Sequence, residues 1–258
     1  MWLIWRGPAL RAAVIGRVAG GIIASVVAAM ASLTSVAPPA AAEWYGDLYA
    51  GIGFTQSHNV FEQPDNGVQI VSHTFLDVQV DNTATYGGRT GYWSESLPWL
   101  GIGLDVFHFE PNMPQQLRTF AVVNIAVPFT FQEVDVSVTA VAFDLLRLRY
   151  PLFTSPEFPK GRLQPYFAGG PAIFITTVTD TSHFTPNGQS DTKTPLGAKI
   201  STGLVWHITP LIGVFGEYRF TYFNVTPVFV STAQGALAVP QTSTFYTHHL
   251  LAGVSLAF

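Results

Sequence analysis

The sequence lacks cysteine and is poor in charge. None of its 258 residues is cysteine and only 11% are charged, less than half of the roughly 25% found in a typical soluble domain. Without cysteine, disulfide bonds and thiolate chemistry are excluded, although the compartment is not identified. The net charge of −4 is too small to indicate a nucleic-acid partner. So little charge, beside 48% apolar residues, is not typical of a protein whose whole surface faces water.

Long hydrophobic runs are missing after the N-terminal segment. No later stretch reaches the roughly 20 apolar residues that a membrane-spanning helix needs. A closed β-barrel is the other structure that satisfies every backbone polar group inside a lipid bilayer. An apolar chain without such runs is therefore compatible with a membrane barrel.

The first 42 residues have the three parts of a secretory signal peptide. Basic residues precede the uncharged stretch VAGGIIASVVAAMASLTSVA, and the small-residue segment PPAAA ends at Ala42. We predict a signal peptide over residues 1–42, with cleavage after Ala42 and one mature domain over residues 43–258. A retained helical anchor is the alternative.

The mature chain alternates apolar and polar residues with a period of two. In WYGDLYAGIGFT, apolar Leu48 and Ile52 share one side, whereas Asp47 and Tyr49 share the other. The pattern recurs in LGAKISTGLVWHI and LIGVFGEYRFTYF. In a soluble sandwich the apolar side would face a core, whereas in a membrane barrel it faces lipid and the polar side lines the lumen. Trp and Tyr near the strand ends, as in aromatic girdles, favour the membrane barrel.

We predict an all-β, eight-stranded antiparallel up-and-down transmembrane barrel. Its strands are expected at 44–55, 83–93, 100–109, 134–150, 163–177, 195–208, 211–224 and 243–258. The long polar connections at 56–81, 110–133, 179–194 and 226–242 are expected outside the cell, and short ones such as SESLP and HITP in the periplasm. Two more alternating stretches, VQIVSHTFLDVQV and TFAVVNIAV, are interpreted as strand extensions or structured external loops. A ten-stranded barrel would instead use them in its wall.

The last strand ends on an aromatic residue. Gly253, the apolar Leu256 and the terminal Phe258 look like the C-terminal assembly signal that the barrel-insertion machinery reads, although Leu251 stands where a polar residue is expected. Together with the export signal, this pattern predicts localisation in the outer membrane of a Gram-negative bacterium.

Three segments carry a family resemblance. GRLQPYFAGGPAIFI, GEYRFTYF and THHLLAGVSLAF resemble the small outer-membrane barrels related to the OmpA transmembrane domain and to Opa-like and OmpW-like proteins. The resemblance implies a non-enzymatic protein that supports the envelope and displays surface loops. The alternative is a porin-like or OmpW-like passage for small or hydrophobic solutes. Expected partners are outer-membrane lipid, lipopolysaccharide and the barrel-assembly machinery, and we expect a monomer without a cofactor.

A lipid-modifying enzyme is the third and most distant hypothesis. The deacylase among small outer-membrane barrels carries a His-x-Ser motif, and no histidine here is followed two residues later by serine. His248 and His249 are adjacent on a strand and so point to opposite faces, which prevents them from sharing one metal ion. We interpret both as polar residues near the external rim, and we predict no catalytic or metal-binding residues.

Charged residues on the polar side of the strands are expected to meet in the lumen. We predict an ionic network there, with Glu217 as a central acid. Its members are Asp47, Arg89, Asp105, Arg147, Arg149, Lys199, Glu217 and Arg219. Asp144 breaks the alternation in VAFDLLRLR, which predicts a β-bulge or a position near a membrane surface.

Overall fold

A computed structural model describes residues 43–63, 72–122, 125–180, 188–231 and 237–258. The predicted signal peptide therefore lies outside the described residues. Within the described residues no helix is long and apolar enough to cross a membrane.

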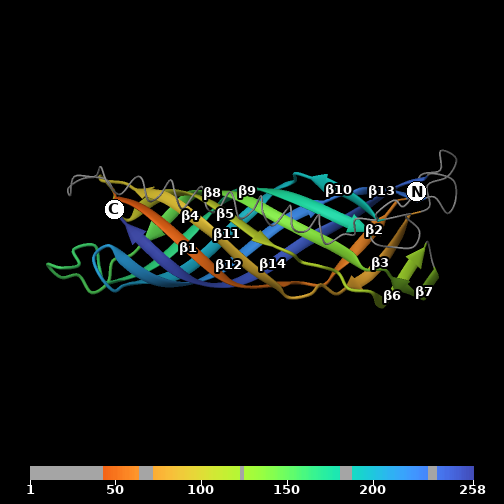
Figure 1. The fold of residues 1–258 in the computed structure, drawn as a ribbon, viewed down its shortest axis with the longest axis horizontal. Coiled ribbons are helices and arrows are strands. Elements are labelled where there is room, and N and C mark those ends of the chain that lie inside the picture. The colour runs from red at the N-terminus through yellow and green to blue at the C-terminus, as the bar shows by residue number, and fades with distance from the viewer. Residues whose placement is uncertain (1–42, 64–71, 123–124, 181–187, 232–236) are drawn as a thin grey trace, which may run out of the picture. The chain divides into compact units, whose positions relative to one another are not determined.

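Eight antiparallel strands form a closed barrel (Figure 1). They follow one another around the wall in chain order, and β14 pairs with β1 to close it. The wall strands are β1 (Glu43–Thr55), β4 (Thr83–Trp93), β5 (Leu100–Phe109), β8 (Val134–Arg149), β9 (Leu163–Asp180), β11 (Leu196–His207), β12 (Ile212–Val225) and β14 (Leu237–Ala257). The eight-stranded barrel predicted from the sequence is confirmed, with boundaries within a few residues at most strand ends.

The barrel has two different ends. At one, which we call the short-turn end, residues 94–99, 150–162 and 208–211 join neighbouring wall strands. The opposite end, the long-loop end, carries six further strands: β2 (His58–Glu62), β3 (His73–Val78), β6 (Gln116–Val122), β7 (Ile125–Phe131), β10 (Gln189–Lys193) and β13 (Val228–Ser231). The two extra alternating stretches contribute to β3, β6 and β7, which lie outside the eight-stranded wall. The ten-stranded alternative is therefore wrong.

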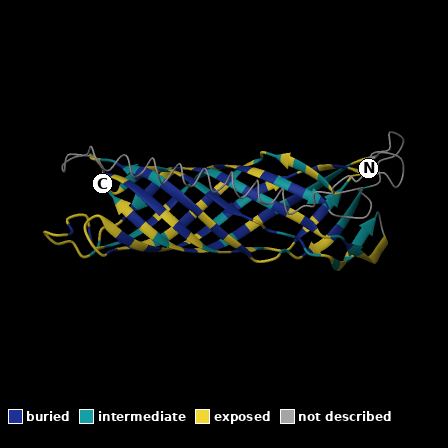
Figure 2. Cartoon of the chain, viewed as in Figure 1, coloured by how far each residue is buried: buried dark blue, intermediate teal, exposed yellow. Residues whose placement is uncertain are grey.

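Buried and exposed residues alternate along the wall strands (Figure 2), as the period-two pattern predicts. On β1, Leu48 and Ile52 are exposed whereas Asp47 and Tyr49 are buried. Because the apolar set points outward, the barrel presents a surface suited to lipid.

A register shift in β8 turns Asp144 into the lumen. The pairing of β8 with β9 is irregular between Ala142 and Leu146, and the pairing of β5 with β8 is irregular between Gly101 and Gly103. Asp144 is fully buried. The predicted bulge is thus confirmed, and it places this carboxylate inside rather than against lipid.

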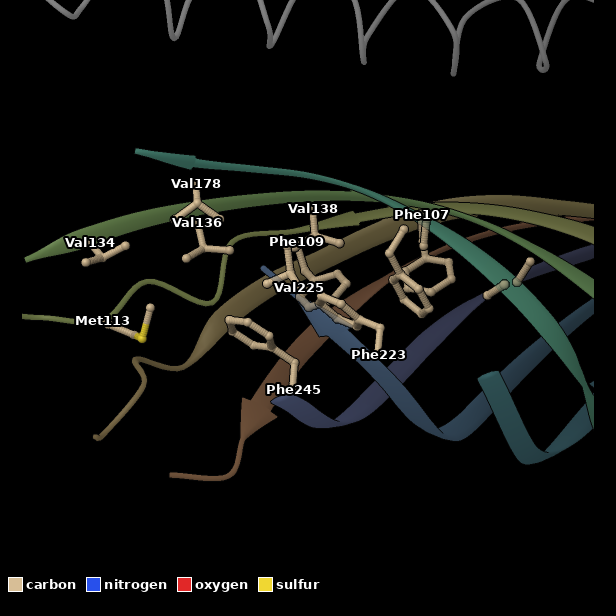
Figure 3. Close-up of a cluster of buried hydrophobic side chains, with 14 of the residues drawn as sticks. Phe107, Phe109, Met113, Val134, Val136, Val138, Val178, Phe223, Val225 and Phe245 are labelled. Carbon is tan, nitrogen blue, oxygen red and sulfur yellow. The ribbon is translucent and has the colours of Figure 1, made fainter. Parts of the chain in front are cut away.

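The lumen toward the long-loop end is filled by apolar side chains (Figure 3). Valines of β8 and phenylalanines of β5, β9, β12 and β14 pack there in one buried cluster, which continues to Val60, Phe75 and Phe131 of the added strands. The expectation that polar residues line the whole lumen is therefore wrong for this half. On β8, Asp135, Ser137 and Thr139 point outward here while the valines point inward, which is the alternation of a strand whose outer face meets water.

Candidate functional site

The structure brings four acids and four bases together inside the barrel. We call them the ionic layer: Asp47, Arg89, Asp105, Asp144, Arg147, Lys199, Glu217 and Arg219. Each is at most 4% exposed. Seven were predicted from the sequence, and Asp144 was missed as a member because its bulge reverses the alternation. The predicted set holds five bases and three acids, and the layer holds four of each, because Asp144 joins it and Arg149 pairs elsewhere.

Glu217 accepts contacts from two arginines and a tyrosine. Arg89 Nη1 lies 2.6 Å from Glu217 Oε2, and Arg219 Nη2 lies 2.8 Å from Glu217 Oε1. The Tyr166 hydroxyl donates to Glu217 Oε2 at 2.6 Å. Arg89 also donates from Nε to Asp47 Oδ2 at 2.8 Å. Glu217 thus joins β4, β9 and β12 across the lumen.

Asp105 is a second junction of the layer. Lys199 Nζ lies 2.6 Å from Asp105 Oδ2 and Arg219 Nη2 lies 2.9 Å from the same oxygen. The Tyr49 hydroxyl donates to the other carboxylate oxygen. Lys199 also lies 2.7 Å from Asp144 Oδ1. Since Arg219 contacts both Asp105 and Glu217, the two junctions form one network.

Aromatic rings cover the guanidinium groups of this layer. The Arg219 Cζ atom lies 4.7 Å from the Tyr49 ring centre and 4.5 Å from that of Phe107. Arg147 Cζ lies 4.6 Å from the Tyr45 ring and 4.7 Å from the Tyr166 ring. A cation over an aromatic face is attracted to it, more strongly when water is excluded. The rings therefore help to fill the lumen around the charges.

Arg149 lies apart from the ionic layer, although the sequence grouped it there. Its Nη2 atom is 2.5 Å from Glu43 Oε2, and its Nε donates to the backbone oxygen of Pro98 at 2.8 Å. Lys160 of a short turn also reaches Glu43, at 2.9 Å. Glu43 was missed as a partner, yet it lies on the same inner alternation as Asp47, which is the signal that would have identified it.

Five phenylalanines form what we call the aromatic layer, on the long-loop side of the ionic layer: Phe107, Phe109, Phe174, Phe223 and Phe245. Phe223 stacks on Phe174 with ring centres 4.3 Å apart, and on Phe245 at 5.0 Å. Each of the five is at most 1% exposed. Figure 3 labels four of them, Phe107, Phe109, Phe223 and Phe245, whose rings lie within the buried cluster.

His249 lies inside the lumen, which corrects the expectation that it lies at the external rim. It is fully buried, with its ring 5.0 Å from that of Phe109. Its Nδ1 and Nε2 atoms lie 2.9 Å and 3.2 Å from the hydroxyls of Thr85 and Thr221. His248 points to the opposite face, where its Nδ1 is 2.6 Å from the Tyr218 hydroxyl. The predicted opposite orientation of the pair is confirmed.

The residues of the predicted assembly signal lie at the end of β14. Leu256 is exposed on the outer surface, and Phe258 directly follows the strand. Gly253 has a packing role, because a Cβ there would lie 2.3 Å from the Leu48 backbone oxygen and 2.7 Å from Tyr49 Cβ. Any larger residue would push β14 away from β1.

A family model described as the outer membrane protein beta-barrel domain matches residues 26–258. A search of curated protein sequences gives no match.

Solved structures with a similar fold include the outer membrane protein OprG from Pseudomonas aeruginosa. It is 11% identical, with a TM-score of 0.54 over 84% of this chain and 96% of OprG. Neisserial surface protein A is 12% identical, with a TM-score of 0.39 over 83% of this chain and 97% of the other. The outer membrane protease OmpT from Escherichia coli is 11% identical, with a TM-score of 0.41 over 87% and 100%. At this low identity, the similarity to OprG establishes only a shared fold. We draw no inference from the two structures with the lower TM-scores.

Proposed function

Because the chain belongs to the outer membrane protein beta-barrel domain family, and its barrel therefore lies in the outer membrane of a Gram-negative bacterium, we propose that it is a closed, non-enzymatic barrel. In this proposal it supports the envelope and displays its long-loop end on the cell surface.

The filled lumen is the observation that carries the proposal. Eight strands enclose an interior just wide enough for side chains to fill, and here the ionic and aromatic layers lie one after the other across it. A solute crossing the barrel would have to push apart the paired charges of the ionic layer and the packed rings of the aromatic layer. The buried acids Glu217 and Asp105 each contact two bases. Because these carboxylates are paired, they are not free for acid-base catalysis.

The proposed orientation puts the short-turn end in the periplasm and the long-loop end outside. Barrels of this class have short periplasmic turns and longer external loops, and the six added strands all extend the long-loop end. The same proposal includes three further points. The assembly machinery inserts the barrel through Gly253, Leu256 and Phe258, the outer surface contacts lipopolysaccharide, and the protein is a monomer.

A passage for small hydrophobic solutes is the second candidate function. The apolar lining of the lumen near the long-loop end favours it, since Val136, Val138 and Phe109 would solvate an apolar compound. The ionic layer argues against complete transit, because such a compound would have to enter a region of paired charges.

The test of the proposed function compares cells with and without the protein. Loss of an envelope-supporting barrel should increase sensitivity to detergents and bile salts, and wild-type protein should restore resistance. Uptake of small sugars and of small hydrophobic compounds should be unchanged. Normal detergent resistance together with impaired uptake of a hydrophobic compound would instead support the passage.

A further inference from the structure

One exposed base at the short-turn end has no acidic partner. Every other lysine and arginine among the described residues lies within 4.0 Å of an acid, and Arg162 alone among them does not. Its only hydrogen bonds to described residues are made by its backbone. The guanidinium of Arg162 is therefore exposed, charged and free to bind an anion.

Aromatic rings hold this guanidinium without neutralising it. The Arg162 Cζ atom lies 5.2 Å from the ring centre of Phe158 and 5.4 Å from that of Trp206. Phe158 is buried, whereas Trp206 is 44% exposed and lies on the outer, apolar alternation of β11. Because a cation is attracted to an aromatic face, the Arg162 side chain is directed to the outer surface of the barrel rather than to the lumen.

The backbone around Arg162 is fixed at the junction of β9 and β11. The Arg162 amide donates to the Phe153 carbonyl at 3.2 Å, and its own carbonyl accepts from the His207 amide at 2.8 Å. The preceding Gly161 has a φ of 88°, and a Cβ there would lie 2.8 Å from the Leu152 nitrogen. The close approach and the left-handed backbone both require glycine at this position.

Apolar side chains surround Arg162 at the rim of the outer surface. Phe153, Ile208 and Leu211 are each more than half exposed. Phe153 also has a φ of 55°, a conformation that is rare for a bulky residue and that is typically retained at functional positions. Tryptophan at a strand end, as with Trp206, is typical of the boundary between acyl chains and headgroups. Arg162 therefore lies at the depth of the lipid headgroups.

We propose that Arg162 binds the phosphate group of a membrane phospholipid, whose glycerol and upper acyl chains lie against Trp206. A guanidinium can donate two parallel hydrogen bonds to phosphate oxygens, and an indole ring presents an apolar face to the chains. The inference rests on the location of the barrel in the outer membrane. In the orientation proposed above, the lipid belongs to the leaflet that faces the periplasm.

The experiment measures lipid binding by native mass spectrometry of the folded barrel released from detergent micelles. Phosphatidylglycerol is titrated into wild type and Arg162→Gln, and the apparent dissociation constants of the first bound lipid are compared. We expect about tenfold weaker binding to the variant, the usual effect of losing a hydrogen bond between charged groups. The urea midpoint should not change, because Arg162 contacts no acid. Equal dissociation constants in wild type and Arg162→Gln would overturn the proposal.

Lys160→Gln is the matched control. It removes the same charge two residues away, but Lys160 contacts Glu43 at 2.9 Å. Binding of phosphatidylglycerol should stay within about twofold of wild type, because exposed ion pairs contribute little and Lys160 does not contact the lipid. Equal weakening in Lys160→Gln and Arg162→Gln would show a general effect of charge and would overturn the proposal.

Two further ligands test which part of the lipid is recognised. Diacylglycerol with the same acyl chains lacks the phosphate and should bind equally to wild type and Arg162→Gln, so a dependence on Arg162 would overturn phosphate recognition. Inorganic phosphate in excess, at constant ionic strength, should not displace phosphatidylglycerol, and displacement would overturn the assignment to a lipid. Because Arg162 lies outside the lumen, failure here leaves the closed barrel standing, and a conducting lumen leaves this site standing.

Discussion

The two layers that fill the lumen are held together by opposite chemistry. In the ionic layer every acid contacts at least one base at 2.7 Å or less, so the loss of one member leaves an uncompensated buried charge. In the aromatic layer each ring contributes through area and stacking, so losses are graded. The comparison teaches that one narrow barrel can be closed twice, once by pairing and once by packing.

The change from one layer to the other follows the strands. Along β12 the inward residues include the charged Glu217 and Arg219 and then, beyond Thr221, the apolar Phe223 and Val225 toward the long-loop end. Along β5, Asp105 precedes Phe107 and Phe109 in the same direction. The inner face thus changes from charged to apolar within each strand, at about the level where the outer face of β8 becomes polar.

Glu217→Ala should have the largest effect, because it breaks the ionic layer and leaves the aromatic layer intact. Arg89 and Arg219 would each lose a carboxylate within 2.8 Å. We expect the free energy of unfolding to fall by about 3 to 5 kcal/mol, less if water enters the lumen. Urea unfolding in micelles, followed by tryptophan fluorescence, measures this change.

Glu95→Ala is the matched control for that variant. Glu95 lies exposed in a short turn, and its loss should change stability by less than about 0.5 kcal/mol. If both substitutions cost the same, the buried network would not be the source of the stability.

Phe223→Leu breaks the aromatic layer instead. It removes the stacking contacts with Phe174 and Phe245, each worth about 0.5 to 1.5 kcal/mol beyond area burial. We expect a loss of about 1 to 3 kcal/mol in the free energy of unfolding, with the lumen still closed by the ionic layer.

Phe143→Leu, on the exposed outer face of β8, is the control for packing. Its loss of stability should be clearly smaller, since both side chains suit lipid. A similar loss in the two variants would mean that the rings of the lumen do not act as a packed layer.

The smallest expected effect concerns β2, at the long-loop margin of the apolar part of the lumen. Burial lowers the pKa of His58 in β2, where its ring lies 4.9 Å from that of Phe245. In the unfolded strand, His58 takes up a proton at higher pH than it does in the folded strand. Protonation therefore favours the unfolded strand, and the stability of β2 falls as pH drops below about 6.5. Hydrogen exchange of β2 and β3, corrected for intrinsic rates, should rise from pH 7.5 to 5.5. His58→Phe should remove that rise, and an unchanged acid sensitivity would assign it to another group.

The sequence predicts the ionic half better than the apolar half. Alternation identified the eight wall strands and seven members of the ionic layer, because inside a lipid-facing strand a charge can only point inward. The interpretation of His249 as a residue near the external rim was wrong, although the alternation itself puts it on the inner face. The alternation also did not anticipate Phe109 and Phe223 in the lumen. Beyond the lipid-facing band, the outer face of the strands meets water and the inner face forms an apolar core. Polar residues then point outward and apolar residues inward, the reverse of the arrangement within the band. The alternation alone does not show at which residue this reversal occurs.

The conductance of the purified wild-type barrel in a planar lipid bilayer tests the central claim most directly. Because each layer closes the lumen, we expect no steady ion conductance for wild type, for Phe223→Leu or for Glu217→Ala, and a gain of conductance only when the two substitutions are combined. A large and stable conductance of the wild-type barrel would contradict the closed lumen and would favour the passage.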